Sequence, residues 1–201
     1  MAETRLEPST DSDLVTTSLR FARRVHLGQH RKQTYEQFIE HPIAVARLLS
    51  EQGLDGPILA AAYLHDVVEK TQVEIDELRA RFGPEVGGMV EALSDDAGID
   101  AYAERKRALR QQVLAAGRDP VLIYAADRVA NLRDWRTVAP DAREACARRL
   151  DTTLDERLEL WGEDLEQLTA YDPKLPFLAE MEIELRELRA EAAAPAAGPS
   201  A

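Results

Sequence analysis

The residues best suited to chemistry are an adjacent histidine and aspartate, His65 and Asp66, inside an apolar stretch of the chain. The run AAAYL precedes this pair and two valines follow it. Burying an imidazole and a carboxylate without partners is costly, so both side chains need a partner in the protein interior. A shared divalent cation is such a partner, because neutral imidazole and carboxylate both bind metal ions.

Two further segments offer ligands of the same kind. Asp127 interrupts another apolar run, VLIYAA, and Asn131 follows four residues later on the same helix face. His41 comes directly before Pro42, which marks the start of a helix. A set of two imidazoles and two carboxylates suits Mn²⁺, Fe²⁺, Co²⁺ or Zn²⁺ better than Mg²⁺ or Ca²⁺. We therefore predict one divalent cation bound by His41, His65, Asp66 and Asp127.

Other polar residues could act on a substrate beside this cation. Glu69 follows Asp66 by three residues, so on a continuous helix it points the same way, within reach of a water at the metal. Arg31 and Lys32 lie in a loop just before the first histidine ligand, where phosphate-binding groups are needed. Lys106 is a further candidate for binding phosphate.

Each of these patterns also has a structural interpretation. A lone His-Asp pair is weak evidence of a metal site, and Asp127 could pair instead with Arg128, the next residue. Aromatic side chains at helical spacing, such as Tyr124 and Trp135, are typical of a core. Arg110, like other arginines on helices, is expected on a solvated face. The metal hypothesis depends on three such segments occurring in one chain.

Helices must position these residues, because Ala, Leu, Glu and Arg dominate the chain and alternating strand patterns are missing. Proline at helix starts and glycine at helix ends predict the boundaries. The expected helices span residues 13–28, 42–52, 57–70, 73–82, 84–93, 104–115, 121–135, 141–162 and 174–192. We predict a single all-α domain over 13–189, with disordered ends at 1–12 and 190–201.

Charge and composition exclude several classes of function. The formal net charge is −12, so the chain should not bind nucleic acid polymers, although a local basic pocket could still hold a small phosphorylated ligand. No apolar run approaches the ~18 residues of a membrane span, and no membrane partner is expected. The single cysteine, Cys146, favours a reducing compartment. We expect a cytoplasmic protein.

The ordered motifs resemble a known family over about residues 14–138. Five segments are similar to the hydrolase domain of the RelA/SpoT proteins: FARRVHLGQHRK, FIEHPIAVARLL, AAYLHDVVEKT, FGPEVGGMVEAL and AADRVANLRDW. A sixth, LSDDAGIDAYAERKRALR, resembles the small, free-standing alarmone hydrolases of metazoan SpoT-homologue type. The resemblance implies an all-α HD-domain fold. It also implies Mn²⁺-dependent removal of the 3′-pyrophosphate from guanosine tetra- or pentaphosphate, (p)ppGpp, which gives GDP or GTP.

The resemblance also assigns roles to individual residues. The four predicted metal ligands match the metal ligands of the family. Glu69 matches the first residue of a catalytic Glu-Asp pair, and Asn131 matches an asparagine that contacts substrate. Arg31 and Lys32 match a pair that grips phosphate. These roles are implied by the motifs alone.

Two departures from the family pattern leave alternatives open. Lys70 stands where the family has the aspartate of the Glu-Asp pair, and the loop before His41 carries one extra residue. The first departure bears on the rate of catalysis, and the second on substrate fit. The alternatives are an HD phosphohydrolase acting on another nucleotide, such as NADPH, and a catalytically weakened module that binds alarmone.

Overall fold

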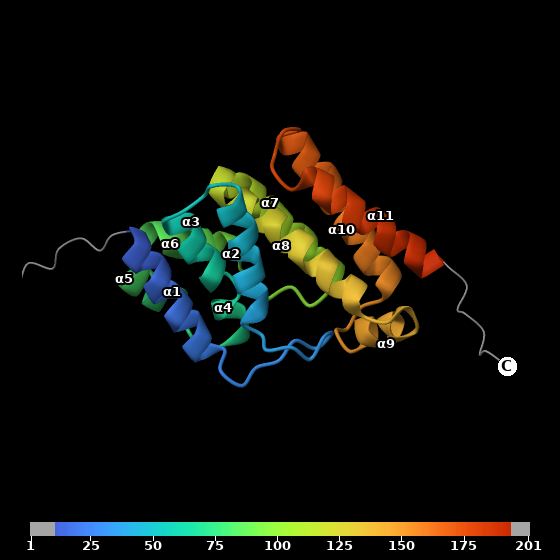
Figure 1. The fold of residues 1–201 in the computed structure, drawn as a ribbon, viewed down its shortest axis with the longest axis horizontal. Coiled ribbons are helices and arrows are strands. Elements are labelled where there is room, and N and C mark those ends of the chain that lie inside the picture. The colour runs from blue at the N-terminus through green and yellow to red at the C-terminus, as the bar shows by residue number, and fades with distance from the viewer. Residues whose placement is uncertain (1–10, 194–201) are drawn as a thin grey trace, which may run out of the picture.

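Two groups of helices lie on either side of one long central helix in the computed structural model, which describes residues 11–193 (Figure 1). The helices in chain order are α1 (Asp11–Val25), α2 (Glu40–Glu51), α3 (Pro57–Leu64), α4 (Val67–Lys70), α5 (Ile75–Phe82), α6 (Pro84–Leu93), α7 (Tyr102–Ala116), α8 (Arg118–Thr137), the short 3-10 helix η1 (Pro140–Ala142), α9 (Arg143–Arg148), α10 (Leu154–Tyr171) and α11 (Leu178–Ala193). No strand forms within these residues, and the predicted all-α class is confirmed.

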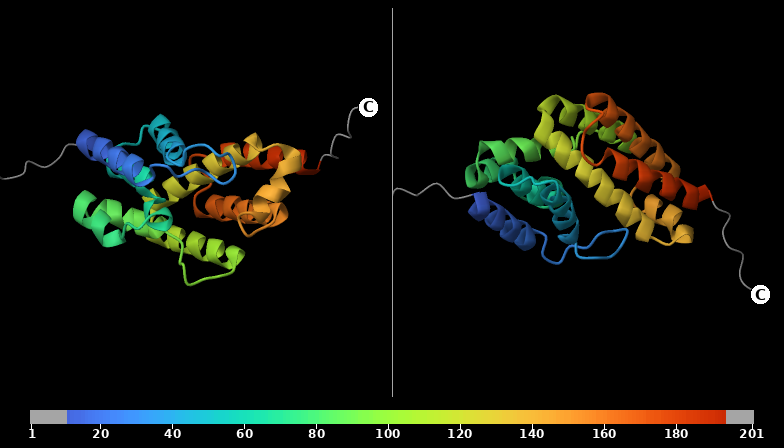
Figure 2. Two further views of the ribbon diagram at one scale, coloured as in Figure 1. Left: turned by 90° about the horizontal axis from the view of Figure 1, so that it is seen from below. Right: turned by 45° about the horizontal axis from the view of Figure 1, so that its top comes forward.

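Helix α8 is the central element of the bundle. Residues 120–127 are all buried, so this part of the helix is enclosed on every side rather than on one face. It packs against α2, α3 and α6 on one side and against α7, α10 and α11 on the other (Figures 1 and 2). Asp127 therefore lies deep in the bundle, at the junction between the two groups of helices.

Several predicted boundaries agree with the structure. Pro57 and Pro84 are the first residues of α3 and α6, as their fixed φ angle favours. Gly83 and Gly117 separate consecutive helices, and both have positive φ, at 91° and 110°. Among the described residues, no helix has the length and apolarity needed to cross a membrane.

The helix predicted over 57–70 is interrupted at the His-Asp pair. Helix α3 ends at Leu64, and α4 begins only at Val67. The carbonyl of Ala62 would accept from the amide of residue 66 in an unbroken helix. Instead it accepts from His65 Nδ1 at 2.8 Å. The pair therefore sits in a turn between two short helices.

The C-terminal third also differs from the predicted pattern. The helix expected over 141–162 is divided, because the chain turns at Asp151, which has a φ of 55°, before α10 starts. The ends of the ordered domain move as well: α1 begins at Asp11 and α11 continues to Ala193, inside segments predicted to be disordered. The rest of those two segments lies outside the described residues.

Candidate metal centre and active site

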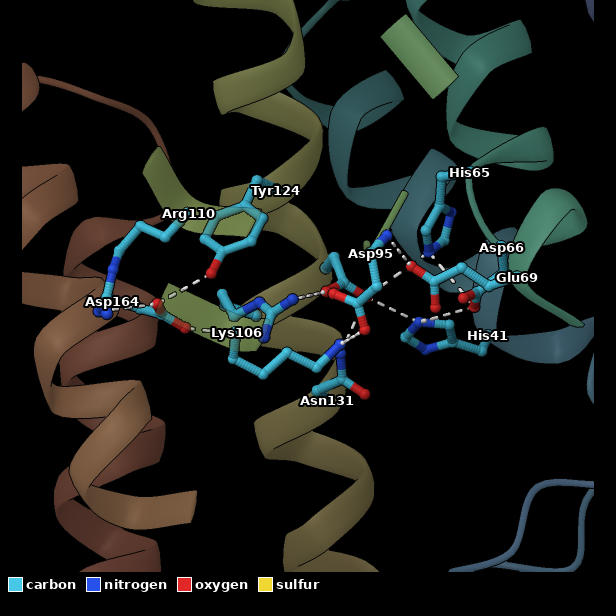
Figure 3. A network of polar contacts seen from close by, with 12 residues as sticks. His41, His65, Asp66, Glu69, Asp95, Lys106, Arg110, Tyr124, Asn131 and Asp164 are labelled. Atoms are coloured by element: carbon cyan, nitrogen blue, oxygen red, sulfur yellow. Dashed lines mark hydrogen bonds and ion pairs between the residues drawn. The ribbon is translucent and has the colours of Figure 1, made fainter. Parts of the chain in front are cut away.

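Three distant segments bring two histidines and two aspartates together. His41, on the first turn of α2, has its Nε2 2.8 Å from Asp127 Oδ1 on α8. His65 Nε2 is 3.6 Å from that same oxygen. Asp66 Oδ2 lies 3.4 Å from the Nε2 of His65 and 3.9 Å from that of His41 (Figure 3). His41, His65 and Asp127 thus form one cluster, and Asp66 lies against both of its histidines.

The donor atoms fit a single ion. Ligand atoms of His41, His65 and Asp127 all lie within 4.8 Å of one another, and all three residues are buried. The Nδ1 of His65 is engaged by the Ala62 carbonyl, which fixes the ring and leaves Nε2 directed at the carboxylates. Asp66 is the least enclosed, with a side chain 15% exposed. The two carboxylates would balance a dication.

Electrostatics keep the two carboxylates of the cluster ionised. Burial acts to lower the pKa of His65, but the carboxylates of Asp66 and Asp127 outweigh it and raise that pKa to about 9. Burial acts to raise the pKa of Asp66, and the adjacent His65, Lys70 and His41 lower it to about 2. The pKa of Asp127 is held well below its usual range against burial, chiefly by Arg128. Both aspartates are therefore ionised at neutral pH.

The two carboxylate oxygens of Asp127 have different partners. Its Oδ1 accepts from the side-chain amide of Asn131 at 2.8 Å and faces the histidines. Its Oδ2 pairs with Arg128 at 2.9 Å. The arginine pairing considered from the sequence is thus real, but it leaves the other oxygen directed at His41 and His65.

The cluster lies in a pocket of about 610 Å³, a volume within the range of small-molecule sites. Basic residues outnumber acidic ones on its walls, against the charge of the whole chain. The basic lining residues are Arg31, Lys32, Lys70, Arg105, Lys106, Arg128 and Arg157. The acidic ones are Asp66, Glu69, Asp95, Asp127 and Asp151. With a dication bound, the pocket would attract an anionic ligand.

Glu69 also lines this pocket, and its two carboxylate oxygens have separate partners. Its Oε1 accepts from the backbone amide of Asp95 at 2.8 Å. Its Oε2 lies 3.1 Å from the ammonium of Lys70. Burial acts to lower the pKa of Lys70, but Asp66 and Glu69 outweigh it and raise that pKa, so the ammonium stays charged. Glu69 is thus a carboxylate oriented by two partners beside the predicted metal ligands.

The predicted phosphate-binding residues divide into two kinds. Arg31 is buried and already engaged, by Asn131 Oδ1 at 2.9 Å and Asp134 Oδ2 at 2.8 Å. Lys32 is exposed at the rim of the pocket. Lys106 lines the wall and pairs with Asp95. All three cations lie in the pocket of the His–Asp cluster.

A second polar network extends from the pocket to α10 (Figure 3). Asp164 is buried, and its Oδ1 accepts from the hydroxyl of Tyr124 at 2.8 Å and pairs with Arg110 at 3.1 Å. Its Oδ2 is 3.6 Å from Arg128, which also holds Asp127. The expectation that Arg110 is solvated was wrong: the residue is 3% exposed. Tyr124 belongs to the core, as predicted.

Three pocket residues escaped the sequence analysis. Tyr102 on α7 and both Arg157 and Trp161 on α10 line the cavity. Residues 141–162 show only amphipathic helical spacing, in which an arginine looks like a surface residue. Nothing in the local pattern marks the side of α10 that faces the pocket.

Known proteins are similar to this chain in sequence. A guanosine-3′,5′-bis(diphosphate) 3′-pyrophosphohydrolase of Xenopus tropicalis is 35% identical over 136 residues, which are 66% of this chain and 75% of the relative. An enzyme of the same name from Vibrio cholerae is 40% identical over 133 residues, 63% of this chain but only 19% of that longer protein.

A solved structure has the same fold as this chain. It is described as a metazoan ortholog of SpoT that hydrolyzes ppGpp, and it superposes with a TM-score of 0.68 at 26% identity. The match covers 93% of this chain and 98% of the other. The family model described as an HD domain matches residues 18–155, which include all four predicted ligands. The chain therefore belongs to the HD domain family.

Proposed function

We propose that this protein is a metal-dependent (p)ppGpp 3′-pyrophosphohydrolase, which releases pyrophosphate and leaves GDP or GTP. The observation that carries the proposal is a cluster of His41, His65 and Asp127 in a pocket with an excess of basic residues. Asp66 lies against both histidines of this cluster. The names of the most similar relatives give the same reaction.

We propose Mn²⁺ as the ion that these four residues bind. Two imidazole nitrogens and two carboxylate oxygens form a mixed set that suits Mn²⁺ among the divalent metals. When bound, such an ion supplies an activated water at neutral pH and polarises a phosphoryl oxygen. The buried, low-pKa carboxylates of Asp66 and Asp127 hold the charge that the ion requires.

Glu69 and Asn131 are proposed to act at the reacting centre. Glu69 is held by the amide of Asp95, so its carboxylate can orient a water and accept a proton from it. Its other oxygen, Oε2, contacts the ammonium of Lys70. This oxygen must leave the ammonium before it can reach the water. Asn131 holds Asp127 Oδ1 through its amide, and its carbonyl oxygen keeps Arg31 beside the site.

The cations of the pocket are proposed to bind the phosphate groups. Arg31 is held rigidly by Asn131 and Asp134, and a preorganised guanidinium stabilises developing negative charge without rearrangement. Lys106 and Lys32 add charge from the wall and the rim. We also propose a cytoplasmic location, which suits the free, buried thiol of Cys146.

A substrate and metal panel tests the proposal. Purified protein is incubated with ppGpp, pppGpp or NADPH and with Mn²⁺, Zn²⁺, Mg²⁺ or EDTA, and the products are separated by anion exchange. We expect GDP or GTP with pyrophosphate in the presence of Mn²⁺, and none with EDTA or in His65→Ala. Asp76→Ala, at an exposed position on α5, should keep full activity. Phosphate release from NADPH with an inert ppGpp would contradict the proposed substrate.

A further inference from the structure

Arg157 differs from the other cations of the pocket in its surroundings. Arg157 comes from α10, beyond residues 18–155 that match the HD domain model. Its guanidinium carbon lies 4.9 Å from the ring centre of Trp135 and 5.0 Å from that of Tyr102. It is thus packed against two aromatic rings on the wall of the pocket that holds the His–Asp cluster. Such packing fixes the plane of the guanidinium and attracts its charge.

Arg157 lacks the carboxylate partner that comparable residues have. Arg31, Arg105, Lys106 and Arg128 each lie within 4.0 Å of an aspartate oxygen. Within residues 11–193 no carboxylate lies that close to Arg157, and its buried Nε has no hydrogen-bond partner. Burial lowers its pKa, as expected for a cation without a counter-charge. Arg157 is partly buried, and removing a cation from water in this way is costly unless an anion pairs with it.

Other cations gather at the same place. The ring of Tyr102 also faces the guanidinium of Arg105 at 5.8 Å and the ammonium of Lys106 at 6.0 Å. Arg128 is near enough to lower the pKa of Arg157 through repulsion between like charges. Asp95 is the carboxylate that Arg105 and Lys106 share. Positive charge therefore exceeds negative charge around Tyr102.

This cluster is separated from the metal ligands along α8. Trp135 follows Asp127 by eight residues, which places it about 12 Å further along the helix axis. That distance is of the order of the length of a nucleotide. A ligand with a phosphate group at the metal cluster could therefore place a second anionic group beside Arg157.

We propose that Arg157 binds the phosphate group that stays on the nucleotide, which for (p)ppGpp is the 5′-di- or triphosphate. The inference rests on the proposed function for the position of the cleaved group. The planar guanidinium can donate two parallel hydrogen bonds to phosphate oxygens, which a lysine cannot do. Arg157 is thus a substrate-binding residue that selects nucleotides phosphorylated at both ends.

The test separates binding of the 5′-phosphates from turnover. GDP carries the 5′-diphosphate and no 3′ group, so its binding by calorimetry in EDTA reports on this contact without metal or hydrolysis. Losing a charge-assisted contact should raise the Kd for GDP about 10- to 100-fold in Arg157→Gln. Guanosine, used as the uncharged probe, should bind the variant as it binds the wild type. Arg148→Gln removes the same charge from the exposed part of α9 and should leave both unchanged.

Kinetics and a conservative variant complete the test. With ppGpp, Arg157→Gln should raise KM by a similar factor and keep kcat within a few-fold, because the contact is far from the cleaved bond. Arg157→Lys keeps the charge and the fold but loses the paired geometry, so its Kd for GDP should rise about threefold or more. Wild-type protein that does not bind GDP would overturn the proposal. So would an equal loss for GDP and guanosine, or wild-type affinity in Arg157→Lys.

The two proposals fail in different ways. If ppGpp is not hydrolysed, the GDP measurements still decide whether Arg157 binds a 5′-phosphate. If ppGpp is hydrolysed and Arg157→Gln changes neither the Kd for GDP nor KM, the proposed function stands and the role of Arg157 is wrong.

Discussion

The ammonium of Lys70 lies 3.1 Å from Glu69 Oε2, so a cation holds the carboxylate proposed to handle the attacking water. The contact is between neighbours in the chain, on the short helix α4. The ammonium occupies one of the two oxygens with which Glu69 could take a proton from a water. The lysine that replaces the family aspartate at position 70 thus contacts the proposed catalytic carboxylate directly.

Replacing this cation should therefore speed the reaction. Lys70→Asp removes the partner of Glu69 and adds a second carboxylate, and we expect ppGpp turnover to rise about tenfold or more. Lys70→Met frees Glu69 without adding a carboxylate and should give a smaller rise. Initial rates of pyrophosphate release with Mn²⁺ measure both. Unchanged or reduced turnover in Lys70→Asp would contradict this account of position 70.

The hydrogen bond from Tyr124 to the buried Asp164 should stabilise the folded protein. Burial raises the pKa of the Tyr124 phenol well above its usual value, so it stays a neutral donor to Asp164. Tyr124→Phe removes one hydrogen-bond donor from Asp164 Oδ1. The change should lower the free energy of unfolding by about 1–3 kcal/mol. Urea denaturation followed by circular dichroism measures the change. Tyr171→Phe, at an exposed position, serves as the control and should change it little.

Glu163 should make stability depend on acid pH. Hydrogen bonds from Arg107 and Arg110 lower its pKa to about 2, from a usual value of 4.5. Because the folded-state pKa is depressed, its stabilising contribution is complete above pH 4.5 and is lost as pH falls toward 2. The pair is partly exposed, so the contribution is about 0.5–1 kcal/mol.

A substitution at this position isolates the effect. Glu163→Gln should lower the Tm by about 1–4 °C at pH 7, and the difference from wild type should shrink between pH 5 and pH 3. Glu85→Gln, on an exposed residue of α6, removes the same charge and should not reproduce this pattern. A Tm difference that is constant with pH would exclude the proposed ionic contribution.

The sequence predicted the elements and the four clustered side chains better than it predicted the breaks between helices. Proline and glycine act locally, so the starts of α3 and α6 were readable. The break at His65 was not, because it depends on a side-chain bond to the Ala62 carbonyl. The start of α10 carried a signal that was missed: Thr153 accepts from the amide of Glu156, a typical capping arrangement.

The walls of the pocket were the least predictable part of the site. Apolar surroundings marked Asp127 as buried, since a charge inside VLIYAA stands out. Arg110 and Arg157 carry no such mark, because each lies on an amphipathic helix among other charged residues. Their burial follows from how α7, α8 and α10 pack together, and that packing is a property of the whole fold.

Metal analysis of the purified protein tests the central claim most directly. After loading with Mn²⁺ and removal of free ion, the wild type should hold one ion per chain by elemental analysis, and Asp127→Ala should hold none. Asp76→Ala, at an exposed position on α5, should keep the ion. Wild-type protein without bound metal, or Asp127→Ala with a full complement of it, would contradict the account.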